Sequence, residues 1–316
     1  MRPMHLRECD ILVVGEVFVE FRSQREIAAT DCFEKDVGGA DVVVAATASR
    51  LGAAVSLISA IAHDPFHGFL RERLQAQGIN VDHVITCNGY NGIYFTSPRD
   101  ADAREYLYHR PGNAAENISP SLIYDDLIED CKMVFASSEL QSVSKAARHT
   151  IFKAFHHAHR NDIMVAYDPN LRLQRWSLDD AKESLWSVLP LIDVIFPSTP
   201  EESKALFGFE RPLDVIGFLW DRGVSIVAVK QGPRGCLVGY DGKIEEIPVE
   251  DTGEPVKDLT LVGSAFDGAF LCSISRGEDP FTAARLAVKA SQHKATKGRG
   301  LQSLPTKEDL ISIAAA

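Results

Sequence analysis

The chain of 316 residues has little basic charge, no long apolar run and no paired cysteines. Its formal net charge of −11 argues against a nucleic-acid partner, because affinity for that backbone comes from clustered lysine and arginine. No apolar stretch approaches the ~20 residues that span a bilayer. The first apolar run, in "CDILVVGEVF", is too short for a secretion signal and is typical of a strand. We therefore expect a cytoplasmic protein without a nucleic-acid or membrane partner.

The sequence also lacks a pattern typical of a metal or disulfide framework. Its six cysteines are widely spread and contain no C-x-x-C pair, which predicts reduced thiols. Three neighbouring histidines, His156, His157 and His159, do not have a standard zinc spacing, and a polar helix end explains them better. We expect no structural metal.

Short apolar strands alternate with amphipathic helical segments along most of the chain. Strands are expected in "DILVVGEVFVEF", "AAVSLISAI", "KMVFAS", "IMVAYD", "DVIFP" and "VSIVAVK". Helices are expected after the glycine pair of "GGADVVVAATASRLG", over "PFHGFLRERLQAQG" and over residues 143–159. This alternation predicts one α/β domain over residues 1–316, with a mainly parallel sheet covered on both faces.

Two stretches, residues 16–37 and 90–111, have strand character without following helices. We expect them to pair as a small antiparallel sheet that projects from the main domain. In "REYLYHRPG", period-two geometry places Tyr106, Tyr108 and Arg110 on one face. Such a face suits a polar, anionic small molecule, although the alternation alone slightly favours a solvated hairpin face.

Four stretches in this order resemble the ribokinase/PfkB family of carbohydrate kinases: "GGADVVVAATASRLG", "HDPFHGFLRERLQAQGINVDHV", "VKQGPRGCLV" and "AFDGAF". The resemblance covers essentially the whole chain. It implies a ribokinase-like three-layer αβα sandwich with a mainly parallel sheet, and a small β-sheet lid formed by about 16–37 and 90–111. It also implies ATP and Mg²⁺ as cofactors and a sugar bound under the lid. We further expect a homodimer through the lid, because the unpaired edges of its strands tend to associate across subunits.

Within that family, "GEVFVEF", "GIYF", "YHRPGNAA" and "DPNLRLQRW" look like the 2-keto-3-deoxygluconate kinase branch. This implies a small-molecule sugar acid as ligand, since two guanidinium groups hold a carboxylate well. For Arg172 a surface salt bridge remains an alternative. The implied sugar contacts are Gly38, Gly39, Tyr94, Tyr108, Arg110 and Arg172.

On the nucleotide side, the resemblance implies contacts to phosphate from two regions of the chain. One is the "VKQGPRG" turn, and the other is the start of the helix that contains "AFDGAF". A family motif N-x-x-E, associated with metal and phosphates, becomes "STPE" here, so Glu201 is retained while Ser198 replaces the Asn. The implied phosphate contacts are Lys230, Gly232, Gly235, Val262 and Gly263.

The catalytic stretch departs from the family motif D-T-T-G-A-G-D-A-F, which here is "DLTLVGSAF". Ser264 stands where the family has the Asp that takes the proton of the sugar hydroxyl. Leu261 replaces a glycine that lets the backbone turn freely, and Leu261 and Val262 add side chains near the phosphoryl position. Val43 replaces an Asn that contacts the sugar. Asp267, one helical turn later, is not expected to compensate.

The resemblance and these departures together predict a PfkB-like protein whose phosphorylation of a sugar acid is weak or lost. A non-catalytic sensor that binds a sugar acid or a nucleotide is the alternative. A third hypothesis is an assembly protein that uses the lid only for dimerisation. The retained Tyr108, Arg110 and Arg172 argue against this third hypothesis.

Overall fold

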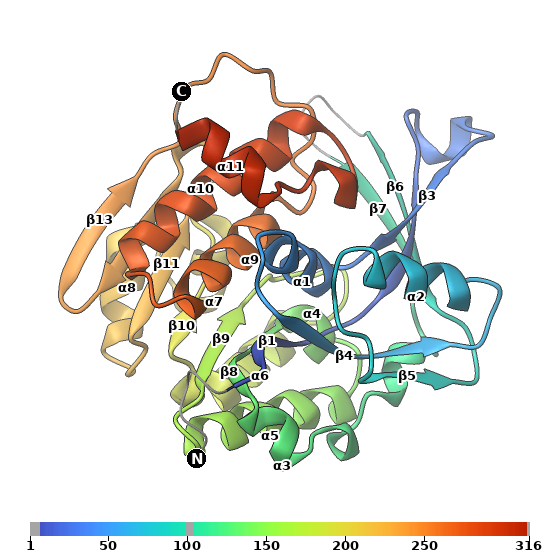
Figure 1. Cartoon of the computed structure of the whole chain (residues 1–316), viewed down its shortest axis with the longest axis horizontal. Coiled ribbons are helices and arrows are strands. Elements are labelled where there is room, and N and C mark those ends of the chain that lie inside the picture. Colours follow the sequence, from blue (N-terminus) through green and yellow to red (C-terminus); the bar gives the residue numbers. More distant parts are fainter. Residues whose placement is uncertain (1–6, 99–103, 315–316) are drawn as a thin grey trace.

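The computed structural model describes residues 7–98 and 104–314, and these contain a nine-stranded sheet between two layers of helices (Figure 1). The strands of this main sheet are Cys9–Val14 (β1), Val55–Ala62 (β4), Val84–Cys87 (β5), Cys131–Ser137 (β8), Met164–Asp168 (β9), Val194–Ile195 (β10), Ile226–Lys230 (β11), Cys236–Tyr240 (β12) and Lys243–Ile247 (β13). Their spatial order is β13-β12-β11-β10-β9-β8-β1-β4-β5. The pairs from β11 to β5 are parallel, whereas β11-β12 and β12-β13 are antiparallel.

The central strands are buried on both sides, which is why they appear in the sequence as continuous apolar runs. Along β1, Ile11 and Val13 contribute to one hydrophobic core, while Leu12 and Val14 contribute to the other. All eight residues of β4 are buried. Successive side chains of a strand point to opposite faces, so each central strand serves both cores.

Two helical layers cover the sheet and confirm the expected three-layer αβα sandwich. Each layer packs on one face of the main sheet, and its residues contribute to the hydrophobic core on that face. The first layer comprises Ala40–Arg50 (α1), His67–Gln75 (α2), Val262–Ser275 (α9), Pro280–Lys297 (α10) and Lys307–Ala314 (α11). The second comprises Asp125–Glu129 (α3), Ser138–Gln141 (α4), Lys145–Arg160 (α5), Leu178–Val188 (α6), Glu201–Phe207 (α7) and Pro212–Trp220 (α8).

A second, four-stranded sheet, which we call the small sheet, lies to one side of the sandwich (Figure 1). Its strands are Phe18–Arg22 (β2), Glu34–Gly38 (β3), Gly92–Pro98 (β6) and Arg104–His109 (β7), in the order β3-β2-β6-β7. The expectation of an antiparallel sheet is wrong for its central pair, because β2 and β6 are parallel. β2 follows β1 and β6 follows β5 along the chain. Because β1 and β5 run in the same direction in the main sheet, β2 and β6 enter the small sheet in the same direction.

Neither a metal cluster nor a membrane span is found among the described residues. Residues 7–98 and 104–314 contain no group of three His, Cys, Asp or Glu side chains arranged to hold a metal ion. None of the helices in these ranges has both the length and the apolar character needed to cross a membrane. His157, from the histidine group noted above, lies 3.4 Å from Asp125.

The fold brings the carboxyl ends of several parallel strands to one edge of the main sheet. Asp168 ends β9 and Lys230 ends β11, and Ser198 follows β10 closely. In open α/β sheets, ligands bind in the crevice outside the carboxyl ends of the strands. The start of α9 also borders this edge, so the helix that carries Ser264 faces it.

Candidate functional site

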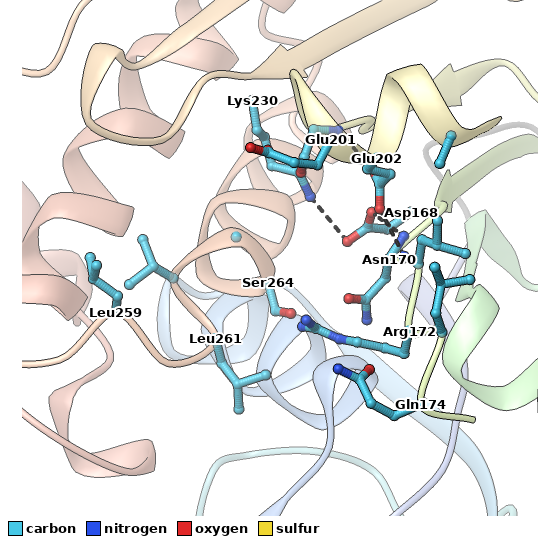
Figure 2. Close-up of a pocket in the computed structure, with 16 residues that line it drawn as sticks. Asp168, Asn170, Arg172, Gln174, Glu201, Glu202, Lys230, Leu259, Leu261 and Ser264 are labelled. Carbon is cyan, nitrogen blue, oxygen red and sulfur yellow. Dashed lines mark hydrogen bonds and ion pairs between the residues drawn. The ribbon is translucent and has the colours of Figure 1, made fainter. Parts of the chain in front are cut away.

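A cleft of about 510 Å³ lies at this edge, between the strand ends and the start of α9 (Figure 2). It is open to solvent, and polar side chains from β9, β11 and the following loops form its walls. Its lining residues are Asp168, Asn170, Leu171, Arg172, Leu173, Gln174, Ser198, Glu201, Glu202, Ala205, Lys230, Leu259, Leu261, Val262, Gly263 and Ser264. The cleft therefore brings together the expected phosphate contacts Lys230, Val262 and Gly263 with Ser264, Glu201 and Arg172.

Lys230 forms a buried ion cluster at the floor of the cleft. Its Nζ lies 3.0 Å from Oδ2 of Asp168 and 3.1 Å from Oδ1 of Asp267. Burial alone would lower the pKa of Lys230, but the carboxylates of Asp168 and Asp267 raise it above its usual value. Lys230 therefore remains a cation, and its ion pairs hold it at one position beside the first turn of α9.

Asp267 is not placed to act as a base in the cleft. It is fully buried within α9, and its carboxylate accepts hydrogen bonds from Lys230 at 3.1 and 3.3 Å. It does not line the cleft. The structure thus agrees with the expectation that Asp267 does not compensate for Ser264.

Glu202 joins two of the loops that form the cleft. Its Oε1 accepts a hydrogen bond from the backbone N–H of Leu171 at 2.8 Å, and Oε2 accepts one from Ser198 at 2.7 Å. Burial and the neighbouring Asp168 raise the pKa of Glu202 to about 7. Sequence comparison pointed to Glu201, which is exposed on the wall of the cleft, and missed this structural carboxylate one residue later.

The first turn of α9 presents backbone N–H groups to the cleft. Leu261 precedes the helix with φ 58° and ψ 20°, the left-handed conformation that glycine adopts without strain. Val262, Gly263 and Ser264 follow in the first turn, where N–H groups have no intrahelical acceptor. A helix start of this kind favours anions. The chain therefore enters α9 through a backbone conformation that favours glycine, although Leu261 stands there.

Aliphatic side chains do not fill the phosphate corner to the extent that the sequence suggests. Leu261 lines the cleft but also packs against the main hydrophobic core. It shares a second cavity of only about 10 Å³ with buried Val43. Because part of the Leu261 side chain packs against the core, it does not close the cleft, and open space remains beside Gly263 and Ser264.

Ser264 is 5 % exposed, and its side chain has no hydrogen-bond partner among residues 7–98 and 104–314. Figure 2 shows the side chain of Arg172 extending across the cleft toward it. Arg172 is exposed and makes no ion pair within the described ranges. The position expected to hold a proton acceptor thus has a neutral hydroxyl, with a cation directed toward it.

The remaining expected sugar contacts belong to the strands of the small sheet or directly follow them, and they do not line this cleft. Tyr94 and Tyr108 have ring centroids 5.5 Å apart. A Cβ added to Gly38 would lie 2.1 Å from the Tyr94 hydroxyl, so glycine is required there. Gly39 has φ 119° and caps α1. Gly38, Gly39, Tyr94 and Tyr108 therefore pack closely around the start of α1.

Arg110 directly follows β7, and hydrogen bonds within the protein hold its guanidinium group. Nε donates to Glu16 Oε1 at 3.1 Å, Nη1 to Ser142 Oγ at 2.8 Å and Nη2 to the backbone oxygen of Glu139 at 2.7 Å. Nη2 makes a further contact with Glu16. The charge expected to meet a ligand carboxylate is therefore already balanced by Glu16.

Two residues in this region were not anticipated from the sequence. Glu139 accepts a hydrogen bond from the backbone N–H of Ala40 at 2.7 Å and lies 2.7 Å from Nη1 of Arg175. The Arg175 guanidinium lies 4.2 Å from the ring centroid of Tyr108. Arg175 belongs to the quoted stretch "DPNLRLQRW", which is a signal that was available. Glu139, in "ASSELQS", belongs to no quoted motif.

The glycines of the "VKQGPRG" turn do not line the cleft either. Gly232 has φ 59° and Gly235 has φ 94°. A Cβ at Gly235 would lie 2.0 Å from the backbone oxygen of Ile247, which explains why glycine stands there. The pairing of β12 with β13 thus accounts for Gly235 without a nucleotide.

The fold is a three-layer αβα sandwich with a polar cleft at the carboxyl ends of its parallel strands, and the start of α9 lies on the wall of that cleft. A family model described as "pfkB family carbohydrate kinase" matches residues 9–307. The chain therefore belongs to the pfkB family of carbohydrate kinases.

Relatives in this family differ in substrate. The chain is 29 % identical over 267 residues to a 2-dehydro-3-deoxygluconokinase of Thermoproteus tenax, covering 82 % of this chain and 79 % of the relative. It is 27 % identical to "Probable fructokinase-4" of Arabidopsis thaliana, covering 96 % of each. The crystal structure of a fructokinase with bound ATP from Xylella fastidiosa has a TM-score of 0.85 at 21 % identity, with 97 % of this chain and 98 % of that chain covered.

Proposed function

We propose that the chain binds a nucleotide and a sugar acid such as 2-keto-3-deoxygluconate, and that its ATP-dependent phosphorylation of that sugar is weak or lost. Ser264, buried at the start of α9 on the wall of the cleft, is the observation that carries this proposal. A serine hydroxyl is a donor and weak acceptor, and it has no accessible basic form at neutral pH. It cannot remove the proton from an attacking sugar hydroxyl.

The other carboxylates on the cleft wall do not supply the missing base. Among the described lining residues these are Asp168, Glu201 and Glu202. Asp168 is paired with Lys230, and both oxygens of Glu202 accept backbone N–H groups. Glu201 is exposed on α7, and the proposal assigns it to the Mg²⁺ that accompanies the nucleotide.

General-base catalysis contributes ~10²–10⁴-fold to rate. Kinases commonly turn over at ~1–100 s⁻¹, and most of that catalysis comes from positioning and charge neutralisation. Loss of the base alone therefore leaves a rate of roughly 10⁻⁴–1 s⁻¹. The open cleft beside Gly263 favours a slow enzyme or a binding protein over one that has lost all ligands.

The nucleotide side of the cleft suits phosphate. The N–H groups of the first turn of α9 and the ammonium of Lys230 would receive it, and Glu201 would face the accompanying Mg²⁺. ATP supplies the phosphoryl group, and Mg²⁺ neutralises its charge. A Cβ at Gly263 would lie 3.6 Å from Lys230 Nζ, which places this backbone close to the cation.

On the sugar side, the proposal assigns carboxylate contact to Arg172 and wall contacts to the tyrosines of the small sheet, which would close as a lid. The edge strands of that sheet are β3 and β7. Unpaired strand edges tend to associate, so we include a cytoplasmic homodimer through this sheet in the proposal. Light scattering of the purified protein tests the dimer.

The second candidate is a sensor that binds without transfer. It is favoured by an open cleft that keeps Lys230 and Arg172 on its wall beside a neutral Ser264. Calorimetric titration with ATP–Mg²⁺ and with 2-keto-3-deoxygluconate separates the candidates. Binding without turnover supports the sensor, whereas slow turnover supports the weakened kinase.

The deciding experiment is an ATP-coupled assay with 2-keto-3-deoxygluconate at saturating concentration. We expect turnover below about 1 s⁻¹. Turnover in the ordinary kinase range would overturn the proposal, because it would require a base that the described cleft does not show.

A further inference from the structure

Glu139 places a carboxylate of the protein itself at the start of α1. The residue is 5 % exposed and belongs to the short helix α4, directly after β8. Its Oε2 accepts the backbone N–H of Ala40, the first residue of α1, at 2.7 Å. Its Oε1 lies 2.7 Å from the guanidinium of buried Arg175. Both oxygens therefore have a cationic or N–H partner.

The surroundings of this carboxylate hold both signs of charge, because Glu16, which pairs with Arg110, and buried Asp41 lie near it, but the cations dominate. The start of α1 favours negative charge, as helix N-termini do. Burial alone would raise the pKa of Glu139, but Arg175, the Ala40 N–H and Arg110 together lower it below its usual value. Arg172 acts in the same direction. Three guanidinium groups and a helix start thus act on one anionic position.

The residues around Glu139 are those expected to contact the sugar. Gly39 immediately precedes Ala40, and Arg110 Nη2 donates to the Glu139 backbone oxygen at 2.7 Å. The Arg175 guanidinium lies over the Tyr108 ring at 4.2 Å. Glu139 consequently stands among the side chains that a bound sugar acid would need.

We propose that the Glu139 carboxylate is an internal occupant of the anion position under the small sheet, and that it determines specificity by competing with the carboxylate of an acidic sugar. Binding of such a ligand requires Glu139 to leave Arg175 and the Ala40 N–H. A neutral sugar makes no such demand. The ligand in this proposal is the sugar acid of the proposed function, on which the inference rests.

The first experiment uses no sugar. Removing the carboxylate in Glu139→Ala leaves Arg175 and the Ala40 N–H without their partner, and formate is small enough to replace it. We expect formate at about ten times its dissociation constant to raise the melting temperature by about 3 °C relative to equal sodium chloride. Wild type should show no formate-specific shift, because Glu139 already occupies the position.

Asp10→Ala is the matched control. Asp10 also accepts one backbone N–H, from Ala54 at 2.8 Å, and pairs with a cation, Lys132, at 2.7 Å. It lies at the opposite end of β1 from the candidate site. Formate should not stabilise this variant. Equal stabilisation of both variants by formate, or none in Glu139→Ala, overturns the inference.

If Glu139→Ala does not fold, Glu139→Gln decides the matter, because the amide oxygen still accepts the Ala40 N–H. Calorimetry should then show 2-keto-3-deoxygluconate bound about tenfold more tightly than by wild type, with ATP–Mg²⁺ affinity unchanged. Equal, weaker or undetectable sugar-acid binding by Glu139→Gln overturns the inference. The formate result and the coupled assay are independent, so failure of the proposed function is distinguishable from failure of this inference.

Discussion

The ammonium nitrogen of Lys230 lies 3.1 Å from Oδ1 of Asp267, and this contact joins the end of β11 to the second turn of α9. Asp267 is fully buried, and the Lys230 side chain is 12 % exposed. A side chain on the ligand wall of the cleft is therefore also part of the structural core. Ligand binding and stability are linked at this residue.

Replacing Lys230 with Met should strongly destabilise the fold. Breaking a buried ion pair by removing one partner costs about 3–5 kcal/mol, because the remaining charges stay buried. Lys204→Met is the control, since Lys204 is 66 % exposed in its pair with Glu210 and a surface pair contributes ~0–1 kcal/mol. Urea unfolding of both variants measures the difference. Similar losses in the two variants would contradict the buried cluster.

Leu261 provides a test of the cap of α9. A non-glycine residue in the left-handed conformation costs roughly 1–2 kcal/mol. Leu261→Gly loses both the strain and the side-chain packing, whereas Leu261→Ala loses the packing and keeps the strain. We expect the Gly variant to be more stable than the Ala variant by about 1 kcal/mol in urea unfolding. An Ala variant of equal or greater stability would show that φ is not positive at this position.

The raised pKa of Glu202 predicts a pH-dependent stability. In the folded protein this carboxyl holds its proton up to a pKa of about 7, whereas in the unfolded chain it loses the proton near its ordinary value of 4.5. Between these values the folded state binds more protons, so this contribution to stability falls as pH rises and is lost above about pH 7. Because the carboxylate borders the open cleft, we expect a change of about 1 kcal/mol rather than the full linkage value.

Glu202→Gln removes this titration and supplies the reference. The stability of wild type minus that of the variant should decline between pH 5 and pH 7 and then level off, in agreement with the pKa of about 7. Urea unfolding in buffers across this range measures it. A difference that is flat, or that rises with pH, would mean that Glu202 is already ionised at pH 5.

The sequence predicted the sandwich well because its signals are local. Buried parallel strands give apolar runs, and the expected helix over 143–159 appears as Lys145–Arg160. The position of Ser264 followed from the gapless register of "AFDGAF". Arg172, which the resemblance named as a sugar contact, lines the cleft, and its role as a contact stays a prediction.

What the sequence did not predict depends on contacts between distant residues. Glu139 and Arg175 form an ion pair between α4 and the loop after β9, and neither residue alone indicates its partner. The parallel pairing of β2 with β6 follows from the main sheet and not from their own pattern. Glu201 and Glu202 are adjacent in the sequence, and the orientation of α7 about its axis determines that Glu202 accepts the backbone N–H groups while Glu201 is exposed.

Arg172 and Arg110 should separate binding from stability. Arg172 is exposed, so Arg172→Gln should leave the free energy of unfolding within about 0.5 kcal/mol of wild type. It should weaken sugar-acid binding at least tenfold in calorimetry. Arg110→Gln removes a buried partner of Glu16 and should cost about 3 kcal/mol. Unchanged sugar-acid affinity in Arg172→Gln would remove Arg172 from the site.

The departures at the start of α9 predict which changes restore phosphotransfer. Ser264→Asp alone supplies a carboxylate, and Leu261→Gly with Val262→Ala removes the aliphatic side chains from the cleft wall. We expect the triple variant to phosphorylate 2-keto-3-deoxygluconate at least about 10²-fold faster than wild type in the coupled assay.

The control for this experiment carries Ser264→Asn in the same background, because Asn has the shape of Asp without its basicity. It should show no gain. Val43→Asn is added if the triple variant stays inactive, since buried Val43 packs beside Leu261. Equal activity of the Asp and Asn variants would mean that proton removal does not limit the rate. In that case the low activity that we propose would have to come from sugar positioning, where Glu139 and Arg175 are the residues to change next.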